Sequence, residues 1–184
     1  MDDQQTDEMR TTDAAPTYAR FGAMILTSMV VMYGVMYLNT YQWGHVEWSE
    51  TRFFMTWLMG ATMAVVMLSF MWSMHPSRAV NVGIYVGAVA VFALALWLVR
   101  SQTTVDDRSY MRAMIPHHSI AVLTSTNADI DDVRVRELAD QIVAAQCREI
   151  SEMNWLIDDI AEHGEVTDAA AAAQRPVPDF DERC

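Results

Sequence analysis

Three long apolar segments dominate the hydropathy pattern of the first hundred residues. They cover residues 21–41, 53–74 and 80–99, and none of them contains a charged side chain. Each has about 20 residues, the length that an α-helix needs to cross the roughly 30 Å hydrocarbon core of a bilayer. Buried helices of a soluble bundle would show a polar face, and these segments show none. The pattern therefore predicts a three-span transmembrane domain within residues 21–100.

The polar ends of the chain lack this pattern. Residues 1–20 and residues 166–184 show no apolar periodicity, and prolines near the C-terminal end oppose a continued helix. Both segments are predicted to be disordered tails, and the second of them is acidic.

Residues 101–165 have the pattern of two helices joined by a short loop. Thr104 opens a capping motif, Asn127–Asp132 is a polar turn in which Asp131 or Asp132 caps the next helix, and Gly164 follows its end. A helical hairpin alone buries little surface, so we expect a second copy to complete a four-helix bundle. The predicted fold class is all-α, with three transmembrane helices followed by an antiparallel helical hairpin.

Most of the net negative charge of the chain lies in residues 101–184. The whole chain has 24 acidic and 12 basic residues and a net charge of −12, and all its basic residues are arginines. Residues 21–100 are nearly neutral. An acidic balance of this kind excludes a nucleic-acid binder, and the apolar content excludes a disordered chain. The arginines that flank the spans are divided too evenly to orient them by the positive-inside rule.

Sulfur and nitrogen donors gather on one face of the hairpin. At about 100° per residue, Met111, Met114 and His118 share one side of the first helix, and His117 lies about 60° further round. On the second helix a mainly aliphatic stripe is expected to face the core, with Gln146 and Glu149 in its middle; its other members are Leu138, Ile142, Met153, Leu156 and Ile160. An unpaired carboxylate is costly there, which points to a ligand role. The predicted metal ligands are Met111, Met114, His117, His118, Gln146, Glu149 and Met153.

The donor types select among metals. Thioethers are soft and select Cu(I), while imidazole suits copper in both oxidation states, so copper is predicted and Cu(I) is favoured over Cu(II). A di-iron bundle needs Glu-x-x-His motifs and a zinc hydrolase needs His-Glu-x-x-His, and the sequence has neither. Simple packing of these side chains remains the alternative.

Methionine is unusually frequent, with 15 residues, and ten of them lie in the first two apolar segments. Those of the second segment recur every four residues, a spacing that forms a slowly winding row on a helix. Such a row is either a thioether path for copper or ordinary apolar packing, because methionine fills irregular gaps well. Cys147 is either a ligand or a small apolar residue. The second set of candidate ligands comprises Met55, Met59, Met63, Met67, Met71, His75 and Cys147.

Three segments together resemble a known family. They are Tyr110-Met-Arg-Ala-Met-Ile-Pro-His-His-Ser-Ile-Ala, Leu138-Ala-Asp-Gln-Ile, and Gln146-Cys-Arg-Glu-Ile-Ser-Glu-Met-Asn-Trp-Leu. They are similar to the domain of unknown function 305 family, and the preceding spans resemble its membrane-anchored subgroup. The resemblance implies a ferritin-like fold, copper binding, and an inner (cytoplasmic) membrane protein with a cytoplasmic N-terminus and an extracytoplasmic hairpin. Members of the family often carry two hairpins, and this chain carries one.

These observations predict a membrane-anchored protein that captures, buffers or transfers copper through Met and His. The expected partners are membrane lipid, a second copy of the chain and a copper donor or acceptor protein. No nucleophile with a base and an orienting group is visible, so no enzyme is predicted. The alternatives are a non-metal scaffold or assembly subunit that dimerises through the hairpin, and a copper-dependent redox accessory protein.

Overall fold

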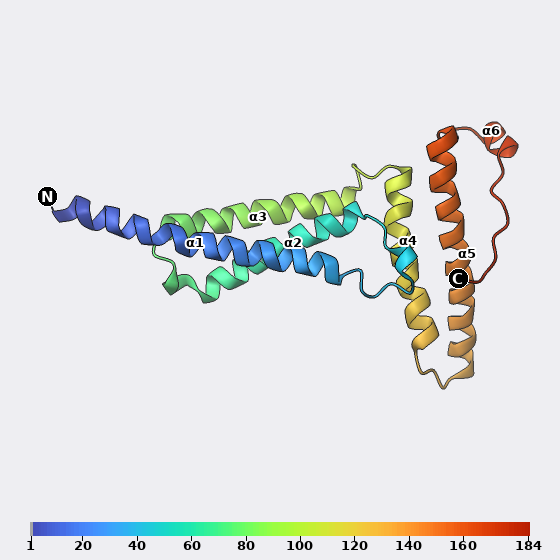
Figure 1. The fold of residues 1–184 in the computed structure, drawn as a ribbon, viewed down its shortest axis with the longest axis horizontal. Coiled ribbons are helices and arrows are strands. Elements are labelled where there is room, and N and C mark those ends of the chain that lie inside the picture. Colours follow the sequence, from blue (N-terminus) through green and yellow to red (C-terminus); the bar gives the residue numbers. More distant parts are fainter. Residues whose placement is uncertain (1) are drawn as a thin grey trace. The chain divides into compact units, whose positions relative to one another are not determined.

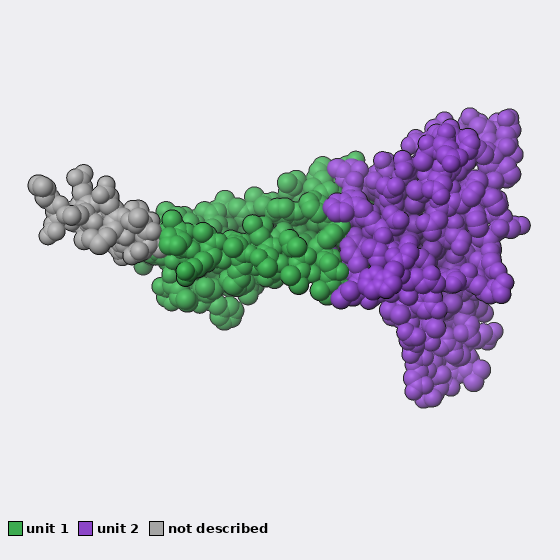
Figure 2. All heavy atoms as spheres, viewed as in Figure 1, with its two compact units in different colours: residues 1–35, 51–103 green, residues 36–50, 104–184 purple. Residues whose placement is uncertain are grey.

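The computed structural model describes residues 2–184, with side chains from residue 15 onward. Within these residues the fold is all-α, as predicted, with no strand (Figure 1). Two compact units divide the chain: unit 1 contains residues 1–35 and 51–103, and unit 2 contains residues 36–50 and 104–184 (Figure 2). The elements in chain order are α1 (Asp2–Val35), η1 (Trp43–His45), α2 (Glu50–Phe70), η2 (Trp72–Met74), α3 (Arg78–Ser101), α4 (Asp107–Asn127), α5 (Val133–His163) and α6 (Ala169–Gln174).

Three helices of unit 1 are long and apolar enough to cross a membrane, which agrees with the prediction of three spans. The apolar stretches are Ala15–Val35, Glu50–Phe70 and Arg78–Ser101. Little of their surface is covered by the rest of the protein, as expected of helices whose outer faces contact lipid.

Two of the spans are displaced from their predicted bounds. The first ends at Val35 instead of residue 41, because the chain turns there and the Tyr41 amide donates a hydrogen bond to the Ser119 hydroxyl in unit 2. The second ends at Phe70 instead of residue 74. A proline disfavours helical geometry in the residue before it, and His75, which precedes Pro76, is accordingly extended.

The helices of unit 1 pack through a small apolar cluster. Phe21, Ile25 and Met29 of α1 are buried against Leu68 of α2, with Met63, Met67 and Ile84 at the edge. Gly60 lets α1 approach α2 closely, because a Cβ at this position would overlap the Met29 side chain. At the end of the unit where α2 passes into α3, the Tyr18 hydroxyl donates to the buried Asn81 side chain at 2.8 Å.

Both tails differ from the predicted disorder. Helix α1 begins at Asp2, since a helix that is already nucleated by a span extends at low cost per residue; Met1 lies outside the described residues. The C-terminal segment forms α6 and then returns to α5 in an extended path. Arg175 pairs with Asp159 at 2.9 Å, and Cys184 is joined to Cys147 by a disulfide, so long-range contacts order a segment that lacks periodicity.

In unit 2, α4 and α5 lie side by side and run in opposite directions (Figure 1). The polar turn predicted at Asn127–Asp132 joins them, and Asp132 caps α5 through the Arg134 amide. Asp106, rather than Thr104, caps α4, because its carboxylate accepts the Ser109 amide at 2.7 Å. Gly164 ends α5 with a positive φ of 79°, as its position after the last periodic residue predicted.

Candidate metal centre

A groove of about 580 Å³ runs between α4 and α5 on one side of this pair. Four of the predicted ligands line it: Met111 and His118 from α4, and Glu149 and Met153 from α5. The spacing of the ligands produces this meeting, because residues three, four or seven apart share one face of a helix. Side chains that carry sulfur, nitrogen and oxygen donors therefore line one groove from both helices.

His118 and Glu149 form the closest contact across the groove. The His118 Nδ1 atom lies 3.1 Å from the Glu149 Oε2 atom, but the angles do not make a hydrogen bond, and Nδ1 is buried with no hydrogen-bond partner among the described residues. The same Oε2 atom accepts a hydrogen bond of 3.1 Å from the Gln146 side-chain amide. Gln146 thus orients the carboxylate toward the imidazole.

Burial favours the neutral form of the His118 ring. It lowers the pKa of His118 below the ordinary 6.5, an effect that the Glu149 carboxylate opposes and the neighbouring His117 reinforces. A neutral imidazole is the form that binds metal. A nitrogen and an oxygen at this separation, without a hydrogen bond between them, are compatible with two ligands of one cation. The residues present therefore fit a metal ion.

The two methionines flank this contact from the hydrophobic core. Met111 and Met153 are 6% and 9% exposed, and both belong to the cluster that holds α4 against α5. Their sulfur atoms therefore have two functions, packing the helix pair and lining the groove. Within the described part of the chain, no three His, Cys, Asp or Glu side chains converge, so a metal bound here would need the thioethers to complete its ligand set.

Three predicted ligands do not line the groove: Gln146, which donates to Glu149, and also His117 and Met114. His117 is exposed and does not line the groove, and its ring centre lies 6.2 Å from that of His118. Met114 packs against the core cluster instead. Helix α4 continues through Pro116, which is itself buried, so the two histidines diverge by their positions around the helix.

The buried face of α5 is also rotated from the predicted stripe. Leu138 and Ile142 were expected in the core and are exposed, whereas Cys147, Ile150 and Ile157 are buried. Gln146 and Glu149 consequently lie half-buried at the edge of the core, which makes the carboxylate less costly than predicted. Glu149 contacts His118 directly, and Gln146 is linked to that contact through its hydrogen bond to Glu149.

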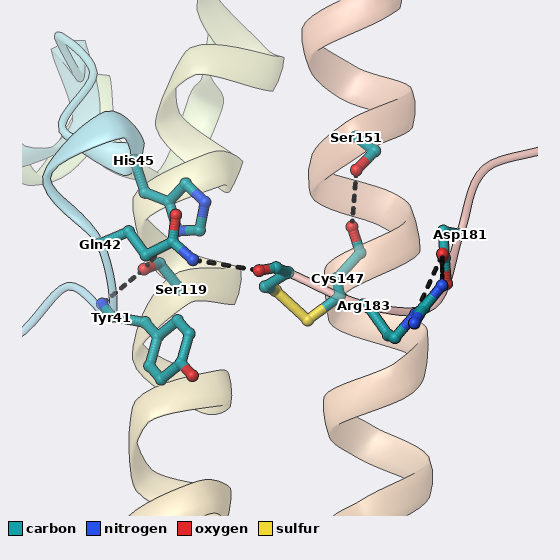
Figure 3. Close-up of a disulfide and its surroundings, with 9 residues drawn as sticks. Tyr41, Gln42, His45, Ser119, Cys147, Ser151, Asp181 and Arg183 are labelled. Atoms are coloured by element: carbon teal, nitrogen blue, oxygen red, sulfur yellow. Dashed lines mark hydrogen bonds and ion pairs between the residues drawn. A yellow bond between two sulfur atoms is a disulfide. The ribbon is translucent and has the colours of Figure 1, made fainter.

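The prediction of Cys147 as a candidate ligand is wrong for this structure. Its sulfur is bonded to that of Cys184, and the side chain is 2% exposed in the centre of the core (Figure 3). A metal ligand requires the thiolate, which a disulfide removes. The sequence contained one indication of this disulfide, because both cysteines come after the three apolar segments.

Sequence reasoning missed the groups that hold α4 from the side away from α5. Ser119 is fully buried, accepts a hydrogen bond of 2.7 Å from the Tyr41 amide and is joined to His45 Nδ1 at 2.9 Å (Figure 3). Burial lowers the pKa of His45. The position of Ser119, directly after the histidine pair, was the available signal. The residues that line the groove beside the ligands were also missed: Asp107, Tyr110, Arg148, Glu152, Leu156 and Ile160.

The residues of the second set of candidate ligands also differ from one another in burial. Met63 and Met67 pack against the unit 1 cluster, while Met55 is exposed at the surface of α2. Met59 and Met71 are half-buried, and His75 is buried. The methionine row therefore turns gradually from the surface of α2 into its packed side.

Comparisons with known proteins find similarity for part of the chain. Residues 97–178 match the family described as "Domain of unknown function (DUF305)". The chain is 29% identical over 145 residues to "Uncharacterized protein L153" of Acanthamoeba polyphaga mimivirus, covering 74% of this chain and 93% of that protein. This alignment is longer than the family match, and only six residues of the chain follow position 178. The similarity to the viral protein therefore includes residues that precede position 97. No solved structure matches the chain.

Proposed function

We propose that this chain, whose residues 97–178 match the family described as "Domain of unknown function (DUF305)", is a membrane-anchored copper-binding protein. It captures copper in the groove between α4 and α5, and it buffers the metal or transfers it to a partner. The proposal depends on the chemistry of the groove and not on the family match, which carries no activity.

The observation that carries the proposal is the meeting of His118, Glu149, Met111 and Met153 in one groove. A neutral imidazole and a carboxylate lie 3.1 Å apart without a hydrogen bond, between two thioethers. Thioethers favour Cu(I), and imidazole accepts it. Copper is the cargo here, and an open groove suits a site that exchanges metal with a donor or acceptor protein.

The acidic surface favours the arrival of cations. Asp107 and Glu152 line the groove beside Glu149, with Arg148 as the cation among its lining residues. Clefts lined by one sign of charge raise the local concentration of the opposite ion. The carboxylates would gather cations generally, and the thioethers would select among them.

Two features support a membrane location with unit 2 in an oxidising compartment. The three apolar helices of unit 1 are long enough to span a bilayer. The Cys147–Cys184 disulfide is typical of proteins outside the reducing cytoplasm. We therefore propose an inner (cytoplasmic) membrane protein whose N-terminus is cytoplasmic and whose α4–α5 pair is extracytoplasmic.

The α4–α5 pair is proposed to be half of a ferritin-like four-helix bundle. Leu138 and Ile142 on α5 are 55% and 36% exposed, although both are aliphatic. A second copy of the chain would cover them and complete the bundle. The same exposed residues favour the second candidate function, a scaffold or assembly subunit that dimerises without metal.

Anaerobic Cu(I) titration of the full chain in detergent tests the proposed function. We expect one bound copper at the groove, and we expect His118→Ala to weaken its affinity by roughly tenfold or more, the scale reported for disturbing a metal site. His163→Ala is the matched control, because His163 lies exposed at the end of α5, away from the groove.

The variants separate the two candidate functions. Met111→Leu and Met153→Leu nearly conserve volume, so they should weaken Cu(I) binding while the helix pair stays folded. Absence of stoichiometric copper in the parent protein, or unchanged binding in His118→Ala, would overturn the copper proposal and leave the scaffold.

A further inference from the structure

His75 is an unusual residue at the end of unit 1 where α2 passes into α3. It is only 4% exposed, although it lies in the short connection between two apolar helices. The aromatic rings of Tyr18 and Phe21 enclose it, with centroids 5.1 and 5.3 Å from its own. Burial of an imidazole in such a place requires partners for both ring nitrogens.

Only one of the two nitrogens has a partner. Nδ1 lies 2.9 Å from the Met71 carbonyl oxygen, and because a carbonyl only accepts, Nδ1 carries the proton of this hydrogen bond. Nε2 is buried and has no hydrogen-bond partner among the described residues. When the ring proton is on Nδ1, Nε2 presents a lone pair, and a buried polar atom without a partner is costly.

This arrangement is that of a metal-binding histidine. Such residues donate one ring N–H to a backbone carbonyl, which fixes the tautomer and directs the other nitrogen at the metal. Tyr18 is held in place independently, since its hydroxyl donates to Asn81 Oδ1 at 2.8 Å and accepts from the Ser77 amide at 3.2 Å. Tyr18 is therefore held in place beside His75 and does not bond to Nε2.

The methionine row supplies the other donors. Met67, Met71 and His75 follow one another at a spacing of four, and the Met71 amide donates to the Met67 carbonyl at 2.9 Å. Met67 packs against the cluster that contains Phe21, whose ring contacts His75. The surroundings of His75 thus contain the thioether of Met67, which packs against the same cluster as Phe21. A soft monovalent cation suits such uncharged donors, whereas Zn²⁺ prefers thiolate, imidazole and carboxylate ligands.

We propose that His75 Nε2, together with the Met67 thioether, forms a second Cu(I) site at the end of the methionine row. The site is separate from the groove between α4 and α5 and does not depend on it. In this proposal the methionine row of α2 ends in a nitrogen ligand, and copper has a binding position in unit 1 as well as in unit 2.

Anaerobic Cu(I) titration with ascorbate, on the full chain in detergent, tests this site. His75→Leu should lose one bound copper per chain, and Met67→Leu should weaken the same copper by roughly tenfold or more. Met74→Leu is the matched control, because Met74 is the neighbouring methionine and is 66% exposed. Circular dichroism checks folding: His75→Leu removes the hydrogen bond to the Met71 carbonyl, but that carbonyl still accepts from the Met74 amide, and the unpaired buried nitrogen is gone.

The combination with His118→Ala separates the two proposals. Loss of one copper in each single variant and of both in the double variant supports both sites. If His118→Ala changes nothing but His75→Leu still loses one copper, the groove proposal fails and the His75 site stands. Unchanged copper binding in His75→Leu, or Zn²⁺ binding in preference to Cu(I) at this position, would overturn the inference.

Discussion

His117 and His118 are adjacent in the chain but have different surroundings. His118 lines the groove, and its Nδ1 atom faces the Glu149 carboxylate at 3.1 Å, while His117 is exposed. Neighbouring residues on a helix point about 100° apart, so both side chains cannot enter the same groove equally. The two histidines, which the sequence presents as a pair, therefore have unequal roles.

This difference gives a testable result for copper binding. His118→Ala should weaken Cu(I) affinity by roughly tenfold or more, whereas His117→Ala should change it by less, because only His118 contacts Glu149. Competition titration of the two single variants measures the difference. Equal losses in both variants would contradict the assignment and return His117 to the ligand set.

The protonation of His118 links the stability of the metal-free protein to pH. Burial lowers the pKa of His118 below 6.5, so between these two values the unfolded chain binds a proton that the folded chain does not. The folded state is therefore favoured above pH 6.5 and loses stability as the pH falls below it.

Thermal unfolding between pH 7.5 and 5 measures this dependence. His118→Gln should show a smaller loss on acidification than the parent, because the group that titrates is gone. His45, whose pKa is also lowered by burial, would preserve part of the slope in both proteins. An identical pH dependence in parent and variant would show that His118 does not contribute.

At the scale of the elements, the contact between α1 and α2 depends on one glycine. A Cβ at Gly60 would lie 2.8 Å from the Met29 Cγ atom, so the two helices approach at a point where no side chain fits. Small residues have this function in membrane helices, where close packing replaces the hydrophobic driving force. The same contact positions Met29 inside the unit 1 cluster.

Gly60→Ala should destabilise unit 1 by about 1–3 kcal/mol, the range for overpacking a well-packed contact. Gly22→Ala is the matched control, since a Cβ there meets nothing within 4 Å, and it should cause no loss. Thermal unfolding in detergent compares the two variants. Equal melting temperatures for both would mean that Met29 relocates without cost.

At the scale of the whole molecule, the disulfide ties the C-terminal segment to α5. It joins Cys147 in the core to Cys184 across a separation of 37 residues, and Gln42 donates to the Cys184 carbonyl at 3.2 Å (Figure 3). The disulfide thereby forms a covalent loop within unit 2, which runs from Cys147 of α5 through the C-terminal segment to Cys184 and back to Cys147. The link orders residues that have little apolar surface of their own.

Cys184→Ser should remove this stabilisation. For a loop of this length the chain-entropy estimate is about 4 kcal/mol, acting mainly on the unfolded state. The melting temperature of unit 2 should fall in the variant, and a reducing agent should produce the same fall in the parent but none in the variant. A parent protein whose melting temperature is insensitive to reduction would contradict this account.

The sequence by itself determined the elements of this protein. Three uncharged apolar segments long enough to cross a bilayer must be helical, because no other single segment satisfies its own backbone hydrogen bonds. Periodicity set both helices of the α4–α5 pair, and Asp132 and Gly164 mark the start and the end of α5 as predicted. Helical spacing also placed Met111 and His118 on one face, and the structure keeps them together.

Only the tertiary structure decided which faces meet. The buried stripe of α5 is centred on Cys147 and Ile150, because packing against α4 and the disulfide set the rotation of the helix, and no local pattern encodes it. The separation of His117 from His118, the unpaired nitrogen of His75 and the order of the C-terminal segment follow from contacts between residues distant in sequence. Local periodicity defines which residues share a face, but long-range packing decides what each face contacts.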